Sequence, residues 1–134
     1  QLYVDDENFL DMATAVSGSG PAYVFLFMEA LIDAAVHLGF SRTDARKLVI
    51  QTIRGSSMFA EQSTVHPAEM RNMVTSPGGT SAEALYQLEK GSFRTIVSKA
   101  VLAAYQRSVA LGKLSTQRVN EQKPPRKATR KRKH

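Results

Sequence analysis

The chain has 134 residues, of which 43% are hydrophobic, enough for one compact domain with a core. It contains no cysteine, which excludes a disulfide framework, a thiolate nucleophile and a cysteine-ligated zinc site, and which fits a cytoplasmic protein. The net charge of +6 is unevenly spread: residues 1–112 carry nine Lys and Arg against eleven Asp and Glu, and residues 113–134 carry nine against one.

Helical periodicity extends along the compact region, and no segment of useful length alternates like a strand. Capping residues and glycines divide it into six expected helices, over residues 7–16, 21–38, 42–62, 67–75, 80–90 and 92–112. Asp6 or its neighbour caps the first, Gly39 ends the second, and Ser41 with Asp44 forms a capping box for the third. The sequence therefore predicts an all-α domain over residues 1–112 and a disordered basic tail over residues 113–134.

The helix expected over residues 21–38 is apolar nearly all round. Its polar residues, Glu29, Asp33 and His37, are spaced four apart and form one narrow stripe. Such a helix must be buried on almost every side, and a domain of this size has little to cover it, so we expect an interleaved dimer. The stripe is more typical of a solvated or interface face than of a metal site or of a general acid at His37, so no metal is assigned. The longest uninterrupted apolar run covers only residues 22–28, and no membrane partner is expected.

Two loops rich in Gly, Ser and Pro, residues 17–21 (SGSGP) and residues 76–81 (SPGGTS), each open directly into an expected helix. Free backbone N–H groups and the positive end of a helix dipole suit a small anion such as a carboxylate. In the second loop, two glycines allow a ligand to approach the backbone, and Thr80 with Glu83 predicts a capping box. A plain helix–helix turn with good caps is the alternative, and local chemistry alone favours it.

The first loop also contains the one candidate for a dinucleotide-binding turn, residues 18–23 (GSGPAY). This segment departs from G-x-G-x-x-G at its last position and follows a helical pattern rather than a strand. Its Pro21 is typical of the first position of a helix. No cofactor-binding residue is therefore assigned to this chain.

Four ordered blocks of sequence resemble the C-terminal half of pyrroline-5-carboxylate reductase. They are residues 15–25 (AVSGSGPAYVF), 66–67 (HP), 71–80 (RNMVTSPGGT) and 88–94 (LEKGSFR), and their spacing matches from about Asp5 to Gly112. That family joins a Rossmann domain for NAD(P)H to an all-helical domain for dimerisation and substrate. The resemblance implies that this chain is the helical domain without the Rossmann domain, with NADP or NAD bound mainly by the missing part. Gln1 falls in what resembles the inter-domain linker, so we expect one domain of a larger enzyme.

The resemblance also implies a substrate site in the second loop, at the interface of a homodimer. The carboxylate of pyrroline-5-carboxylate or proline would be held by the N–H groups of Gly78, Gly79 and Thr80 and by the hydroxyl of Ser76. The family typically has a threonine where this chain has Ser81, with its hydroxyl near the imine nitrogen, so Ser81 is the expected catalytic group. Serine lacks the methyl that restrains χ1, which predicts weaker substrate positioning. Some relatives stack dimers into larger rings.

Three hypotheses remain open: the substrate and dimerisation domain of a reductase of proline biosynthesis, a non-catalytic dimerisation module, and polyanion binding by the tail. A strand and a G-x-G-x-x-G turn upstream of Gln1 would distinguish the first from the second. A solubilising extension is the more typical explanation of such a tail. Nucleic acid is therefore not an expected partner, and any binding to it would go through the tail alone. Among the other candidates, His66 fits a helix start, Asn72 could orient the second loop, and Arg71 and Arg94 are the nearest basic residues, which more often form salt bridges.

Overall fold

The computed structural model describes residues 6–121, and within that range it is helical with no strand. The elements are α1 (Glu7–Ala13), a π-helical turn η1 (Thr14–Gly18), α2 (Gly20–Leu38), α3 (Arg42–Gln62), α4 (Pro67–Met73), α5 (Thr80–Lys90) and α6 (Phe93–Glu121). The all-α prediction is confirmed. Because α1, η1 and α2 run on as one 32-residue rod, residues 6–121 form five separate helical rods rather than the six expected.

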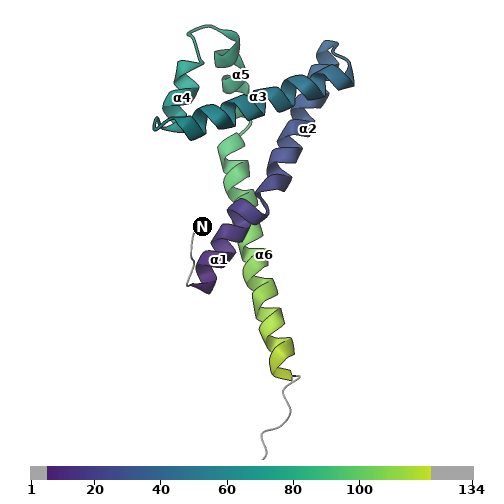
Figure 1. Ribbon diagram of the computed structural model, residues 1–134, viewed down its shortest axis with the longest axis vertical. Coiled ribbons are helices and arrows are strands. Elements are labelled where there is room, and N and C mark those ends of the chain that lie inside the picture. Colours follow the sequence, from purple (N-terminus) through teal and green to yellow (C-terminus); the bar gives the residue numbers. More distant parts are fainter. Residues whose placement is uncertain (1–5, 122–134) are drawn as a thin grey trace, which may run out of the picture.

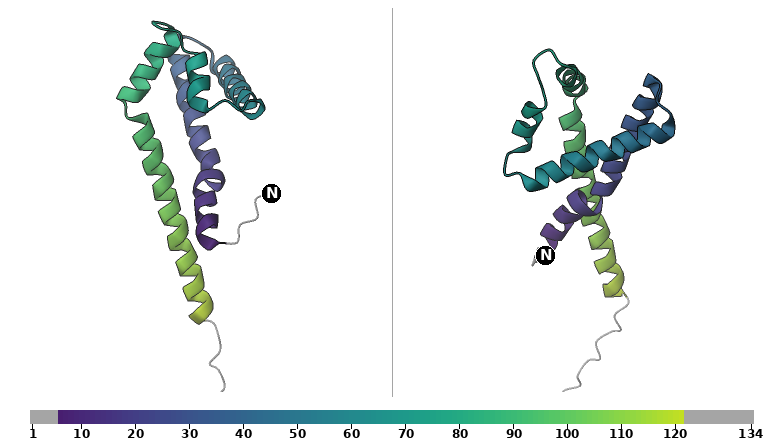
Figure 2. Two further views of the ribbon diagram at one scale, coloured as in Figure 1. Left: turned by 90° about the vertical axis from the view of Figure 1, so that its left-hand side faces the viewer. Right: turned by 45° about the horizontal axis from the view of Figure 1, so that its top comes forward.

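Two long antiparallel rods dominate the fold, α1–α2 and α6 (Figures 1 and 2). They meet where α6 packs against α1 and η1. Two hydrogen bonds join them: the Tyr105 hydroxyl donates to Asn8 Oδ1 at 2.6 Å and the Ser108 hydroxyl donates to Asp11 Oδ1 at 2.5 Å. At the other end α3 packs against α2, and α4 and α5 lead the chain back to the start of α6 (Figure 1).

Local side-chain chemistry sets several helix ends as the sequence predicts. Asp6 caps α1 by accepting a hydrogen bond from the Asn8 N–H at 3.1 Å. Ser41 caps α3 by accepting from the Asp44 N–H at 3.1 Å, and its hydroxyl donates to the Asp44 carboxylate at 2.8 Å. Gly39 ends α2 with φ of +117°, a conformation that favours glycine.

The loop expected over residues 17–21 is absent, and this prediction is wrong. The chain instead passes through η1, in which the Ser19 N–H reaches back five residues to the Thr14 carbonyl at 2.8 Å. The Tyr23 hydroxyl donates to the Ala15 carbonyl at 2.9 Å and so satisfies an acceptor inside the widened turn. Pro21 fits in the first turn of α2 because its missing N–H would have no partner there.

The end expected for the last helix at Gly112 is also wrong, because α6 continues to Glu121. Glycine inside a helix costs only about 1 kcal/mol relative to alanine, and the residues that follow are ordinary helix formers. Residues 113–121 of the predicted disordered tail are therefore helical. The rest of that predicted tail, residues 122–134, lies outside the described residues.

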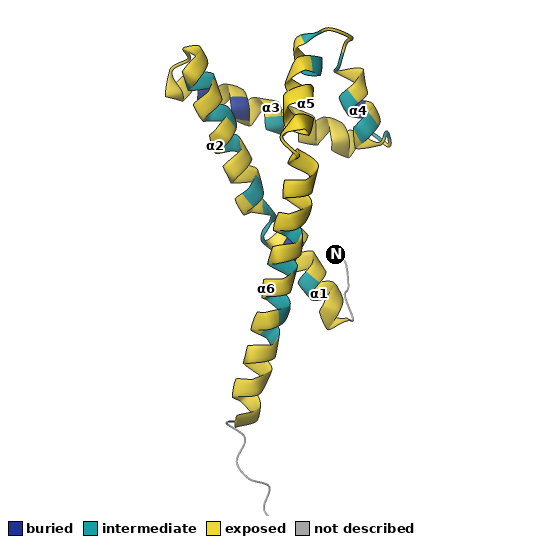
Figure 3. Ribbon diagram, turned by 180° about the vertical axis from the view of Figure 1, so that it is seen from behind, coloured by how far each residue is buried: buried dark blue, intermediate teal, exposed yellow. Residues whose placement is uncertain are grey.

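The protomer has almost no core of its own (Figure 3). Only four side chains are buried in the described part of the chain: Ala15, Ala45, Val49 and Met70. The accessible surface is 12,087 Å², whereas a compact monomer of this mass would expose about 6,900 Å². After subtraction of the roughly 3,200 Å² that an extended chain of the length of residues 1–5 and 122–134 would expose, the surface still exceeds that of a compact monomer of residues 6–121 by about 2,700 Å².

Much of this excess is apolar and lies on the two long rods. Phe25 and Leu26 of α2 are 64% and 67% exposed, and Ile96 of α6 is 60% exposed. By length and composition the α1–α2 rod could also cross a membrane, a test that core helices of soluble proteins pass as well. The small core shows that the rod is only partly covered within one protomer, which is the reason for expecting a second copy.

Candidate functional site

The second Gly/Ser/Pro loop lies between α4 and α5, at the end of the molecule that also holds α3 (Figure 1). His66 starts α4: its Nδ1 accepts a hydrogen bond from the Ala68 N–H at 3.1 Å, and Pro67 follows as the first helical residue. The helix ends at Met73, so residues 74–79 form the connection. The expected role of His66 as a helix-start residue is confirmed.

A tight turn forms the centre of this connection. The Gly79 N–H donates to the Ser76 carbonyl at 3.0 Å and closes the four residues 76–79. Pro77 is the second residue of the turn, and Gly78 is the third, with φ of +68°. Proline followed by a residue of positive φ is the pattern of a type II turn, so Gly78 is required by backbone conformation.

Gly79 has a different role, which depends on the space beside it. Its φ of −82° and ψ of 175° suit any residue. A Cβ at this position, however, would lie 2.6 Å from Ser76 Oγ and 3.1 Å from the Ser76 carbonyl oxygen. The absence of a side chain therefore lets the Ser76 hydroxyl pack directly over the backbone at the N-terminus of α5.

The start of α5 differs from the prediction in its cap and in one predicted donor, the Gly79 N–H. Gly79 is the N-cap and no side chain caps α5, so the predicted capping box of Thr80 with Glu83 is wrong. The reason is that Gly79 enters in an extended conformation, which makes Thr80 the first helical residue. The Gly79 N–H is already used in the turn, and the Glu83 N–H donates to the Gly79 carbonyl. In the range 6–121, the N–H groups of Thr80, Ser81 and Ala82 donate to no other protein group.

The structure brings all five predicted site residues together in this turn and the first turn of α5. Ser76, Gly78 and Thr80 are exposed, and Gly79 and Ser81 are half-buried. Three N–H donors at a helix start and one hydroxyl beside them suit a carboxylate, which such donors stabilise through hydrogen bonds and the helix dipole.

The remaining polar candidates have other partners or lie apart from the loop. Arg94 forms an ion pair with Glu89 at 2.8 Å, and Asp33 of the α2 stripe pairs with Arg42 of α3 at 2.9 Å. The stripe thus faces α3 in part, which sequence periodicity alone does not reveal. Over residues 6–121, no group of three or more His, Asp or Glu side chains is arranged to hold a metal ion.

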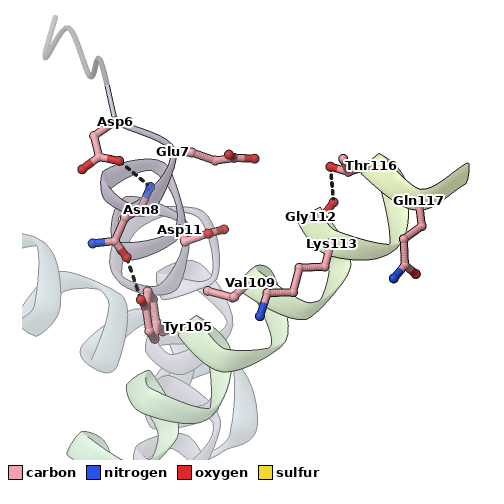
Figure 4. A pocket seen from close by; sticks show the side chains of 10 residues that line it. All are labelled: Asp6, Glu7, Asn8, Asp11, Tyr105, Val109, Gly112, Lys113, Thr116 and Gln117. Atoms are coloured by element: carbon pink, nitrogen blue, oxygen red, sulfur yellow. Dashed lines mark hydrogen bonds between the residues drawn. The ribbon is translucent and has the colours of Figure 1, made fainter. Parts of the chain in front are cut away.

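Two hollows of the protomer do not include the loop. One, of about 590 Å³, is an open groove between α1 and α6, in which Glu7 and Asp11 point toward α6, the helix that carries Lys113 (Figure 4). The other, of about 390 Å³, lies between α2 and α3. Sequence reasoning missed the first groove, because it depends on contacts between residues almost one hundred positions apart and on the part of α6 beyond Gly112. No residue from Ser76 to Ser81 lines either hollow. Most residues of the loop are exposed in one protomer.

Comparisons with known proteins agree on one family. The family model described as pyrroline-5-carboxylate reductase dimerisation matches residues 7–111. The chain is 49% identical over 107 residues to pyrroline-5-carboxylate reductase of Synechocystis, covering 80% of this chain and 40% of that protein. It is 48% identical over 110 residues to the enzyme of Pseudomonas aeruginosa, covering 82% and 40%. The chain thus spans about 40% of the length of these relatives.

Solved structures give the same result for the fold. A Plasmodium falciparum pyrroline carboxylate reductase with NADP bound superposes with a TM-score of 0.77 at 48% identity, covering 80% of this chain and 41% of that one. The Coxiella burnetii pyrroline-5-carboxylate reductase superposes with a TM-score of 0.79 at 41% identity, covering 82% and 41%. The all-helical fold agrees with these matches, and the matches show that the chain belongs to the pyrroline-5-carboxylate reductase dimerisation family.

Proposed function

We propose that this chain is the dimerisation and substrate-binding part of a cytoplasmic pyrroline-5-carboxylate reductase, which reduces 1-pyrroline-5-carboxylate to proline in proline biosynthesis. The names of its relatives support this proposal, and so does the position of its Ser/Gly turn at the start of a helix. The observation that carries the substrate site is the packing of the Ser76 hydroxyl over Gly79, beside the free N–H groups of Thr80 and Ser81.

The described residues do not fit a dinucleotide. The segment with spaced glycines, residues 18–23, lies in η1 and the first turn of α2, and the N–H groups of Ser19 and Ala22 donate to backbone carbonyls. A pyrophosphate needs free N–H groups at a strand–turn–helix junction. The hydride donor, NADPH or NADH, is therefore assigned to a part of the enzyme other than this chain, and no step of hydride transfer is assigned to its residues.

Within this proposal each loop residue has a separate task. Ser76 and the N–H groups of Thr80 and Ser81 hold the substrate carboxylate, and Gly79 leaves room for Ser76. The Ser81 hydroxyl, in the first turn of α5, forms a hydrogen bond with the ring nitrogen, and the proton that this nitrogen must gain on reduction comes from solvent. Homodimerisation covers the exposed faces of α2 and α6 and encloses a loop that is open in one protomer.

Calorimetric binding of proline to the full chain tests the site, with Gly79→Val as the matched variant. Binding by the wild-type chain and its loss in the variant would support a carboxylate site at this turn. A folded dimer that binds no proline would contradict it. That outcome would favour the second candidate, a dimerisation module without a substrate site, which the coverage of only about 40% of the relatives also allows.

A further inference from the structure

Thr75 attaches the loop to the end of α4 through both of its polar groups. Its backbone N–H donates to the Asn72 carbonyl at 3.1 Å, and its hydroxyl donates to the Arg71 carbonyl at 2.6 Å. The residue is half-buried. These carbonyls belong to the last turn of the helix, where acceptors have no helical partner. Thr75 therefore caps α4 from the loop side.

The same kind of bond occurs inside another helix and has a different effect there. The Thr52 hydroxyl donates to the Leu48 carbonyl at 2.8 Å, four residues earlier in α3. Both ends of that bond are already held by the helix, so the bond adds little order. Thr75 lies beyond the end of α4, so its bond fixes a residue that no helix holds.

The position of Thr75 determines the position of the neighbouring residue, Ser76, which belongs to the proposed carboxylate site. The next residue, Ser76, supplies the carbonyl that closes the turn and the hydroxyl that packs over Gly79. In the described chain, no other side chain of residues 74–79 forms a hydrogen bond. Among residues 74–79, the Thr75 hydroxyl therefore donates the one side-chain hydrogen bond that orients this connection relative to α4.

We propose that Thr75 is a positioning residue for the carboxylate site, because its bond to the Arg71 carbonyl fixes the place of Ser76 over the start of α5. This inference rests on the proposed function of the loop. Thr75 itself contacts no substrate and acts through Ser76. A threonine just beyond a helix end is a signal that sequence reasoning could have used, since hydroxyls commonly bond to the backbone carbonyl four residues earlier, whatever residue carries it.

The test compares Thr75→Val with Thr75→Ser in the full chain. Valine keeps the shape of threonine and removes the hydroxyl, whereas serine keeps the hydroxyl. We expect Thr75→Val to speed solvent exchange of the Gly79 N–H and to weaken proline binding, each about fivefold, as loss of one hydrogen bond of ordinary strength gives. Thr75→Ser is expected to restore both values, and Thr52→Val, the matched control, to leave both unchanged.

The inference would be overturned if the Gly79 N–H of Thr75→Val exchanged with solvent at the wild-type rate. It would also be overturned if Thr75→Ser behaved like the valine variant. The exchange is measured without ligand and therefore does not depend on the proposed function. If the wild-type chain binds no proline, the substrate site is refuted, and the exchange at Gly79 alone decides whether Thr75 holds the turn. Circular dichroism confirms that each variant keeps the helical content of the wild type.

Discussion

Dilution should lower the thermal stability of this protein, because folding and association are expected to be one event. Only four side chains are buried in the described part of one protomer, and large side chains of both long rods are exposed. A protomer with so little buried apolar surface cannot offset the conformational entropy of about a hundred ordered residues. The folded dimer should therefore convert directly to two unfolded chains, and its midpoint temperature, Tm, should depend on concentration.

The size of the effect follows from the number of ordered residues. Residues 6–121 of two chains, at about 0.7 kcal/mol per residue near 60 °C, give an unfolding enthalpy of about 160 kcal/mol for the dimer. For an equilibrium between a dimer and two unfolded chains, this enthalpy corresponds to a Tm lowered by about 3 °C for each tenfold dilution. A hundredfold dilution should therefore lower Tm by about 6 °C.

Circular dichroism melts over that hundredfold range of concentration provide the assay, with sedimentation velocity to report the mass at each concentration. A Tm that is independent of concentration would refute the reasoning, since it would show a protomer that is stable alone. Ile96→Glu supplies a second check. At 60% exposure in one protomer the change should be nearly neutral for a monomer, whereas a covered interface would lose several degrees of Tm.

Three further predictions concern single features. Gly112→Ala should raise stability by about 1 kcal/mol, because the residue is inside α6 and a Cβ there would meet nothing within 4 Å; a lower Tm would mean that the helix stops at this residue. Ser81→Thr should tighten proline binding a few-fold by restraining χ1, as calorimetry would show, and unchanged binding would make the methyl irrelevant. Heparin is expected to retain the full chain at low salt, through the seven Lys and Arg of residues 122–134, and not a chain ending at Glu121; equal retention would place the polyanion contact elsewhere.

The helix ends that the sequence predicts correctly are those set by near neighbours. Ser41 finds its partner three residues away in Asp44, His66 caps the N–H of Ala68, and Gly39 needs only its own positive φ. Such interactions are local, so residue type and spacing identify them without knowledge of the rest of the fold.

The features that sequence reasoning missed depend on distant contacts. A run of Gly and Ser fits a loop and a widened helical turn equally well. The packing of α6 against η1 favours the helical turn, and there Ala15 is only 1% exposed. The pairs Tyr105–Asn8 and Ser108–Asp11 likewise join residues 97 positions apart. In the candidate site, the glycines and Ser76 were predicted from turn chemistry, but one of the predicted donors, the Gly79 N–H, is used within the turn, because Gly79 closes the turn and serves as the cap of α5.

The π-helical turn has a consequence for the rotational phase of α1. A residue of an α-helix advances the chain by about 100° around the axis, but a turn closed by a bond that reaches back five residues holds one residue more within nearly the same rotation. In the present phase, Asn8 and Asp11 meet Tyr105 and Ser108 of α6. Deleting a single residue from η1 and restoring a regular α-helix would therefore leave Asn8 and Asp11 at nearly their present phase, whereas one residue added as ordinary α-helix would turn them by about 100° away from α6. The widened turn thus keeps this face of α1 against α6 in spite of its extra residue.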